Sequence, residues 1–108
     1  MSFVPSTYLA LPAGGGCQCG AVRYEISAAP IDGNYCHCRM CQRATGGVFG
    51  VYATIQRDAF RFTEGEPAYF ESSSVARRGF CSKCGTPLTF EYTGSGSISF
   101  TIGSFDEP

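Results

Sequence analysis

Seven cysteines, gathered into three short groups, constrain this 108-residue chain more than any other feature of its sequence. Seven is an odd number, so disulfide bonds cannot pair every thiol. Thiolates are ligands that zinc prefers, and a small domain often needs a metal to supplement its modest hydrophobic core. We therefore expect metal-bound thiols rather than a disulfide scaffold. The groups are Cys17 with Cys19, then Cys36, Cys38 and Cys41, then Cys81 with Cys84.

The last group has the form of a zinc knuckle. Cys81 and Cys84 are followed by Gly85, whose backbone freedom lets nearby N–H groups point at the sulfurs. A knuckle needs two more ligands, and Cys17 with Cys19 is the available pair. Residues i and i+2 of an extended segment point the same way, so this pair could bind one ion together or lie buried as two small apolar side chains. The first option predicts a closed, structural four-cysteine zinc site.

The middle group predicts a different kind of metal site. Cys36, Cys38 and Cys41 place three thiols within six residues, so they can reach one ion without long-range folding. Three protein ligands leave one position of a tetrahedral zinc open, as in zinc sites that carry out chemistry. We therefore expect a second, more labile zinc here and treat these three cysteines as the catalytic candidates.

Three side chains beside this group are candidates for substrate binding. His37 is the only histidine; if Cys36 and Cys38 face a metal from an extended segment, His37 faces the other way. It could still be a fourth ligand if the chain curls, an acid, base or hydrogen-bonding group, or a structural residue. Arg39 and Arg43 could neutralise thiolate charge, hold a carboxylate, or remain solvated on the surface.

A second pair of arginines lies near the last cysteine group. Arg77 and Arg78 could offset the double negative charge of a four-thiolate zinc, or could lie in a solvated turn.

Alternation of apolar and polar residues predicts an all-β fold. Val22, Tyr24 and Ile26 alternate with polar residues, which is the pattern of a half-buried strand. No segment predicts a convincing helix, and the best candidate is a single turn at residues 41–44. The expected strands are 21–27, 48–55, 59–63, 68–72, 78–81, 87–92 and 97–103.

The remaining segments are expected to be irregular. Residues 1–13 contain Pro5 and Pro12 and are predicted to form an irregular N-terminal arm. The glycines at 14–16 predict a flexible entry, and residues 28–33 predict a turn region with Asp32 and Gly33 as strand breakers. Residues 14–108 then form a single zinc-binding β domain.

Charge and hydropathy argue against several classes of protein. The net charge of -1 and the pI of about 5.7 argue against a nucleic-acid-binding protein, which usually carries a basic face. No stretch approaches the roughly 18 apolar residues of a membrane span, and the sequence shows no secretory signal. Because a reducing cytoplasm keeps thiols free for metal binding, we expect a cytoplasmic protein without a membrane partner.

Three motifs in this order resemble the glutathione-dependent formaldehyde-activating enzyme family, which includes centromere protein V. The resemblance runs from about Gly15 to Pro108 and implies an Mss4-like zinc-containing fold of twisted antiparallel sheets with short turns. It also implies a structural zinc at the four-cysteine group and a labile zinc at the three-cysteine group. The motifs are Gly16-Cys-Gln-Cys-Gly-Ala-Val-Arg-Tyr-Glu25, Cys36-His-Cys-Arg-Met-Cys-Gln-Arg43 with Gly46, and Phe80-Cys-Ser-Lys-Cys-Gly-Thr-Pro-Leu88.

The activity that the resemblance implies is that of a carbon–sulfur lyase. Such an enzyme combines formaldehyde with glutathione to give S-hydroxymethylglutathione and catalyses the reverse reaction. The expected partner is a small-molecule thiol such as glutathione, and Arg39 or Arg43 could hold its carboxylate. Members of the family usually continue beyond the Gly-Ser-Phe-Asp-Glu-Pro position into a segment with a histidine–aromatic motif.

An alternative function is a zinc-stapled binding module for a protein or chromatin partner, without catalysis. Its support is a set of basic side chains that could be exposed, at Arg39, Arg43, Arg57 and Arg61.

Overall fold

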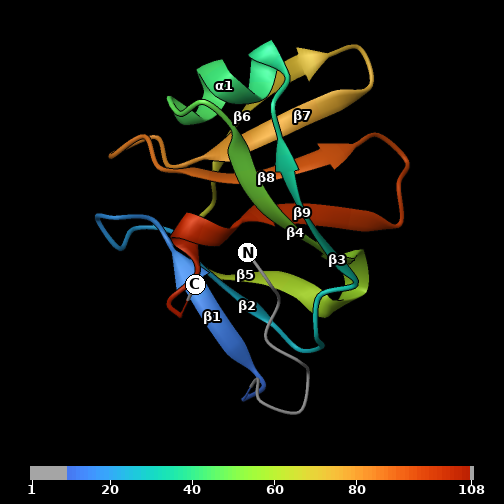
Figure 1. Cartoon of the computed structure of the whole chain (residues 1–108). Helices are drawn as coiled ribbons and strands as arrows, with labels where there is room; N and C mark the ends of the chain where they lie inside the picture. The colour runs from blue at the N-terminus through green and yellow to red at the C-terminus, as the bar shows by residue number, and fades with distance from the viewer. Residues whose placement is uncertain (1–9, 108) are drawn as a thin grey trace.

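Two antiparallel β-sheets form the framework of the fold, as shown in the computed structural model, which describes residues 10–107 (Figure 1). The smaller sheet has the order β1-β2-β5, formed by β1 (Ala13–Gly16), β2 (Arg23–Ile26) and β5 (Phe60–Glu64). Every strand pairing in the described residues is antiparallel, so the all-β prediction is confirmed. Among the same residues, no helix has the length and apolar character needed to cross a lipid bilayer.

The larger sheet has the order β3-β4-β9-β8-β7-β6. A short helix, α1 (Arg39–Thr45), connects its edge strand β3 to β4 and lies at one end of the sheet (Figure 1). Brief 3-10 turns occur at Arg57–Ala59 and Ile102–Ser104. The strands are β3 (Asp32–Cys36), β4 (Gly50–Gln56), β6 (Ala68–Ser73), β7 (Ala76–Phe80), β8 (Pro87–Tyr92) and β9 (Ser97–Thr101).

The hydrophobic core lies between the two sheets. Tyr24 of the smaller sheet stacks on Phe60, with ring centroids 5.0 Å apart, and contacts Phe100 of the larger sheet at 5.6 Å. Ile55 and Ile98, partners across β4 and β9, are buried in the same cluster. Since side chains of a strand alternate between faces, the intervening residues of β4 and β9 point to the other face of the larger sheet, where the cavity described below lies.

The three glycines at 14–16 form strand β1, so the expectation of a flexible entry is wrong. Gly15 pairs with Tyr24, and a Cβ at Gly15 would collide with the Tyr24 ring. The Tyr24 hydroxyl in turn forms a 2.8 Å hydrogen bond with Ser104. Glycine is therefore needed here for close approach over a buried ring rather than for flexibility. Of the predicted arm, residues 1–9 lie outside the described residues and Ala13 already belongs to β1.

Two further expectations need correction near residue 40. Asp32 and Gly33, expected as strand breakers, begin β3 and pair with Thr54 and Ala53. Since β3 is an edge strand whose side chains are largely exposed, it shows no apolar alternation from which it could be predicted. Helix α1 is longer than the single turn expected and ends at Gly46, whose φ of 76° is the usual glycine stop signal.

We expect Gly15→Ala to lower the free energy of unfolding by about 1–3 kcal/mol, because the added methyl group overpacks against Tyr24 and the Ser104 carbonyl. Urea unfolding of the purified variant would measure the change. Gly103→Ala is a matched control, since a Cβ at Gly103 meets nothing within 4 Å. A Gly15→Ala protein as stable as the wild type would show that β1 does not pack closely on Tyr24.

Candidate functional site

The structure brings the first and last cysteine groups together, as predicted. The sulfurs of Cys17, Cys19, Cys81 and Cys84 all lie within 4.8 Å of one another and could hold a metal ion. The Cys17 and Cys19 sulfurs are 3.6 Å apart, and those of Cys19 and Cys81 are 3.7 Å apart. One pair lies in the loop between β1 and β2 and the other in the loop between β7 and β8, so this four-cysteine cluster joins the two sheets.

The loop between β7 and β8 has the local geometry expected of a knuckle. The N–H groups of Lys83 and Cys84 donate to the Cys81 sulfur, with N–S distances of 3.4 and 3.5 Å. The Gly85 N–H donates to the Cys81 carbonyl at 2.8 Å, and Gly85 has a φ of 82° that favours glycine. The N–H groups of Lys83 and Cys84 stabilise negative charge on the Cys81 sulfur, which suits a metal-binding thiolate.

The loop between β1 and β2 also directs a backbone N–H at a cysteine sulfur and contains a glycine with positive φ. The Val22 N–H donates to the Cys17 sulfur at 3.3 Å, and Gly20 has a φ of 81°. The two loops contact each other through Thr86, whose hydroxyl accepts from the Gln18 N–H at 3.1 Å and lies 3.2 Å from the Cys84 sulfur. The hydrogen bond from Thr86 lowers the pKa of the Cys84 thiol to about 5. The four-cysteine cluster is thus held by two loops and the Thr86 hydroxyl that connects them.

The middle cysteines form a second, three-cysteine cluster at the junction of β3 and α1. Cys36 ends β3, Cys38 caps the helix and Cys41 lies in its first turn. Their sulfurs lie within 4.8 Å of one another, with Cys36 and Cys38 at 3.6 Å. His37 is exposed, and its ring packs on Phe49 with centroids 5.2 Å apart. The strand, cap and helix together bring the three sulfurs to one place.

The pKa values of two thiols in the three-cysteine cluster are shifted in opposite directions. The Cys41 N–H donates to the Cys38 sulfur at 3.3 Å and, as the largest cause, lowers the pKa of Cys38 to about 7. The side-chain hydrogen bond with Cys41, again the largest cause, raises the pKa of Cys36 to about 11. Thiolates this close repel one another, so a cation among them would let all three ionise. The cluster therefore fits a metal ion.

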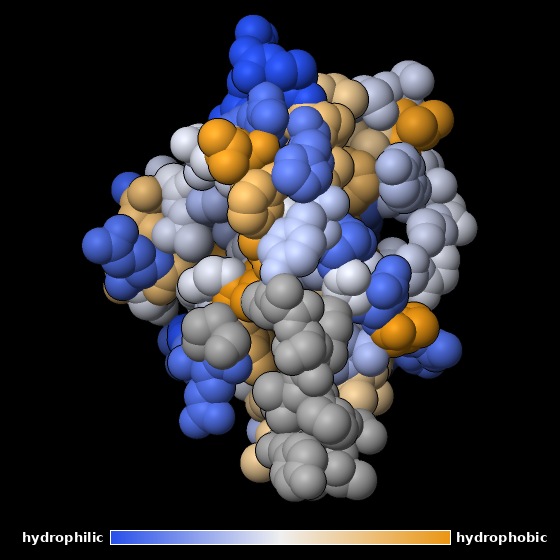
Figure 2. Space-filling model, in the orientation of Figure 1, coloured by the Kyte–Doolittle hydropathy of each residue, from blue (hydrophilic) through white to orange (hydrophobic). Residues whose placement is uncertain are grey.

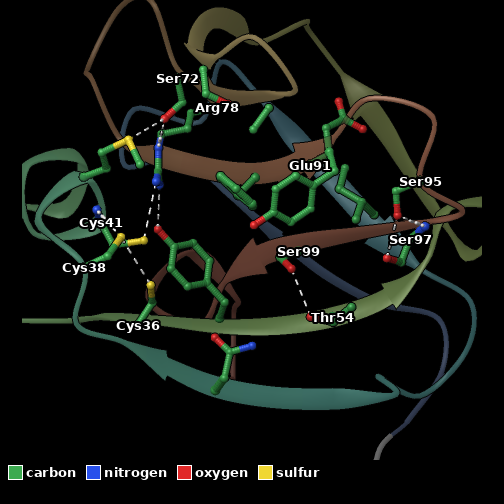
Figure 3. A pocket seen from close by; sticks show the side chains of 18 residues that line it. Cys36, Cys38, Cys41, Thr54, Ser72, Arg78, Glu91, Ser95, Ser97 and Ser99 are labelled. Carbon is green, nitrogen blue, oxygen red and sulfur yellow. Dashed lines mark hydrogen bonds between the residues drawn. The ribbon is translucent and has the colours of Figure 1, made fainter.

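A cavity of about 350 Å³ opens beside this cluster, over the face of the larger sheet that points away from the core. Cys36, Cys38 and Cys41 lie at one end of it, and Ser95 and Ser97 lie at the other (Figure 3). Its wall is rich in hydroxyl and amide groups, including those of Asn34, Thr54, Ser72, Ser95, Ser97 and Ser99.

A buried arginine connects the cavity wall to the three-cysteine cluster. Arg78 is only 9% exposed and lies over the Phe90 ring, 4.7 Å from its centroid. Its Nε donates to Ser72 at 3.1 Å and its Nη1 to the Tyr52 hydroxyl at 3.1 Å. Its Nη2 donates to the Cys41 sulfur at 3.4 Å (Figure 3). A permanent positive charge is therefore fixed against one sulfur of the cluster.

Sequence reasoning did not identify Arg78 as part of this site. It treated Arg77 and Arg78 as a pair near the four-cysteine cluster or in a solvated turn, but both lie in β7 and contact different groups. Arg77 donates to Glu91 at 2.7 Å and covers the Tyr69 ring. Alternation along a strand predicts that these two neighbouring side chains point to opposite faces of the sheet. It does not predict which of them contacts Cys41.

The three substrate-binding candidates lie outside the lining of the cavity. His37, Arg39 and Arg43 are exposed, and Arg39 donates to Gln42 at 2.7 Å on the surface of α1. The tip of the molecule at α1, at the top of Figure 2, is strongly hydrophilic, and hydrophobic patches lie directly below it. A role of these three residues in binding substrate stays a prediction.

The basic side chains invoked for a binding module are partly neutralised. Arg61 pairs with Glu25 at 2.9 Å, and Arg57 pairs with Glu91 at 3.5 Å. These contacts reduce the positive charge available to an anionic partner, although they do not test the module itself.

Comparison with known proteins gives a consistent picture. A family model described as "Glutathione-dependent formaldehyde-activating enzyme" matches residues 12–108. An uncharacterized lyase of Schizosaccharomyces pombe is 33% identical over 79 residues, covering 73% of this chain and 57% of that protein. A putative glutathione-dependent formaldehyde-activating enzyme of Halomonas elongata is 33% identical over 84 residues, covering 68% of this chain and 52% of that protein. The chain thus spans about half the length of the curated relatives it matches.

The fold has a counterpart among solved structures. A crystal structure of a Rhodobacter sphaeroides protein superposes with a TM-score of 0.73 at 20% sequence identity. The match covers 88% of this chain and 89% of that one, so the two proteins share a fold.

We expect the two clusters to differ in their contribution to stability. Cys81→Ser removes a ligand from the cluster that joins the two sheets, where a structural metal contributes on the order of 10 kcal/mol in small domains, so most of the protein should be insoluble or unfolded. Cys38→Ser affects only a local cluster, so it should fold with a melting temperature within several degrees of the wild type. Soluble yield, melting temperature and metal per chain would measure both. The division into two clusters is wrong if Cys81→Ser keeps its metal and melting temperature, or if Cys38→Ser also unfolds.

We expect Arg78→Met to weaken the hold of the three-cysteine cluster on its metal, because Cys41 loses a charge-assisted hydrogen bond. Such a bond is worth about 1.5–3 kcal/mol, so the chelator concentration that releases half of this metal should fall roughly tenfold or more. A chelator titration with a colorimetric metal indicator would measure it. Arg77→Met is the matched control and should release metal like the wild type. Equal behaviour of the two variants would mean that Arg78 does not support the cluster.

Proposed function

The chain belongs to the glutathione-dependent formaldehyde-activating enzyme family, and on this premise we propose that it is a zinc-dependent enzyme of the carbon–sulfur lyase type that acts on thiol–aldehyde adducts. One observation carries the proposal: the three-cysteine cluster opens on a cavity of about 350 Å³, large enough for a small molecule. The four-cysteine cluster has a full tetrahedral set of ligands, so the chemistry is assigned to the three-cysteine cluster.

The proposal includes two zinc ions, one for each group of cysteine ligands. Cys17, Cys19, Cys81 and Cys84 would hold a structural zinc, and Cys36, Cys38 and Cys41 would hold a labile one. When bound, the labile zinc would supply an exchangeable position for a substrate thiol in its thiolate form, which is the nucleophilic one. A set of thiolates alone suits zinc better than magnesium or calcium, which prefer oxygen ligands.

The chain's own residues hold charge and donate hydrogen bonds near the reacting atoms. Arg78 balances part of the negative charge of the sulfurs, which would otherwise repel an approaching thiolate. Tyr52 lines the cavity and accepts from Arg78, and its own proton can donate to the neighbouring Cys41 sulfur or to an oxygen atom of a ligand.

The reaction joins or separates two small molecules. In the forward direction the thiol releases its proton, the sulfur bonds to the carbonyl carbon, the C=O π pair moves to oxygen, and that oxygen takes up the equivalent of the released proton. In the reverse direction the proton leaves, the C=O bond re-forms and the carbon–sulfur bond breaks. In this proposal the Tyr52 hydroxyl hydrogen-bonds to that oxygen atom in both directions.

Glutathione is the thiol that this proposal favours, because the matching family model and the Halomonas relative carry its name. Formaldehyde is the aldehyde that the same names suggest. A reducing cytoplasm is the compartment that such thiol chemistry requires.

We expect the zinc-loaded protein to accelerate the exchange between formaldehyde plus glutathione and S-hydroxymethylglutathione. Magnetisation-transfer NMR would measure the exchange rate against a protein-free control. Cys38→Ser should lower the protein-dependent rate at least tenfold, because one ligand of the exchangeable site is lost, and Arg77→Met, outside the cluster, should keep it. A zinc-loaded wild type with no rate above background would refute the proposed activity, and full activity in Cys38→Ser would place it elsewhere.

A further inference from the structure

The cavity beside the three-cysteine cluster has an apolar wall in addition to its hydroxyl groups. Phe90 and Tyr92 of β8 line it, together with Met40 of α1, Tyr52 of β4 and Ala76 of β7. The Phe90 and Tyr92 rings meet edge to face, with centroids 5.0 Å apart. Met40 is 54% exposed and Tyr92 is 58% exposed. Apolar surface of this kind, open to water inside a cavity, is surface that a ligand can cover.

The cavity is much larger than formaldehyde requires. Formaldehyde has two non-hydrogen atoms, and a water molecule, which has one, takes a share of about 30 Å³ in the liquid. The cavity has a volume of about 350 Å³. Formaldehyde alone would therefore leave most of the apolar wall without a contact, whereas an aldehyde with a ring on its carbonyl carbon would cover it.

The charged groups of the cavity lining are engaged with the protein. Arg78 donates to three protein groups at the cysteine end. The Glu91 carboxylate is paired with Arg77 at 2.7 Å and with Arg57 at 3.5 Å. Glutathione carries two carboxylates and an ammonium group, and burial of a charge without a partner is costly. The apolar wall therefore suits the carbonyl substrate better than it suits the charged ends of the thiol.

The three-cysteine cluster is also accessible from outside the cavity. Cys38 is exposed, as are its neighbours His37, Arg39 and Arg43, which lie outside the cavity lining. A thiol that approaches from this side keeps its charged ends in water, where they remain solvated. The cavity side of the cluster is then left for the aldehyde.

We propose that the carbonyl substrate of this chain is an aldehyde with an aromatic ring, and that the ring packs against Phe90, Tyr92 and Met40. The inference rests on the proposed function, which places the reacting sulfur at the three-cysteine cluster and the carbonyl oxygen at the Tyr52 hydroxyl. Aromatic rings pack well edge to face or offset on other rings, and a methionine sulfur makes favourable contacts with a ring.

The reaction of an aromatic aldehyde balances as it does for formaldehyde. The thiol releases its proton, the sulfur bonds to the carbonyl carbon, and the C=O π pair moves to oxygen, which takes up the equivalent of that proton. The product is a hemithioacetal that carries the ring on its carbon atom, and no further reactant is needed.

Chemical-shift NMR on the zinc-loaded, 15N-labelled chain would test the ring-binding subsite with two unreactive probes. Benzyl alcohol stands for an aromatic aldehyde, and methanol stands for formaldehyde. We expect benzyl alcohol to shift the amide signals of cavity residues such as Ser99 and to approach saturation at concentrations where methanol causes no comparable shift. Tyr92→Thr should raise the Kd of benzyl alcohol about fivefold, as the loss of one ring contact implies.

The matched control is Phe70→Thr. Phe70 is an aromatic residue of β6 in the same sheet, is 63% exposed and lies outside the cavity lining. Threonine suits a strand, so both variants should fold, and Phe70→Thr should keep the Kd of benzyl alcohol within twofold of the wild type. Equal weakening in the two variants, or benzyl alcohol binding no better than methanol, would overturn the inference.

A rate measurement separates this inference from the proposed function. The zinc-loaded wild type should accelerate the exchange between benzaldehyde plus glutathione and their hemithioacetal, as magnetisation-transfer NMR would show. Acceleration with formaldehyde but not with benzaldehyde would overturn the inference and leave the proposed function standing. Tyr92-dependent binding of benzyl alcohol without acceleration for either aldehyde would refute the proposed function and support the ring-binding subsite alone.

Discussion

The convergence of four cysteine sulfurs within 4.8 Å is the constraint on which the rest of the structure depends. Two of them lie in the loop between β1 and β2 of the smaller sheet and two in the loop between β7 and β8 of the larger one, so the cluster joins one sheet to the other at the end of the core. The aromatic contacts of Tyr24 with Phe60 and Phe100 need that arrangement, because neither sheet alone can bury these rings. A chain of this length has a small hydrophobic core, and a cluster that connects the two sheets supplements the stability that this core provides.

The two faces of the larger sheet have different surroundings: one packs into the core, and the other lines the cavity of the candidate site. Period-two alternation places Ile98 and Phe100 in the core and Ser99 on the cavity face. The same alternation places Arg77 and Arg78 in different surroundings: Arg77 pairs with Glu91, while Arg78 is buried beside Cys41. A fold that needs only one face of this sheet for its core leaves the other free for a site.

The two cysteine clusters obtain their electrostatic support differently. Backbone N–H groups, such as those of Val22 and Lys83, point at the sulfurs of the four-cysteine cluster. The three-cysteine cluster receives a full positive charge from Arg78 and opens on a cavity. Fixed backbone dipoles suit a closed structural site, whereas a side-chain cation beside an open cavity suits a site that exchanges ligands.

By itself, the sequence determined the all-β class, the approximate positions of most strands and the division of seven cysteines into four and three. These follow from local chemistry, namely alternation along a strand and ligand spacing along the chain. It did not determine β1, where glycine serves a close approach to Tyr24, or β3, an exposed edge strand. Only the tertiary structure decided that Arg78 rather than Arg39 or Arg43 lines the cavity beside Cys41, and that Thr54 and Ser99 line it as well. Those contacts join strands far apart in the chain, and local pattern carries no information on which distant side chains a fold brings together.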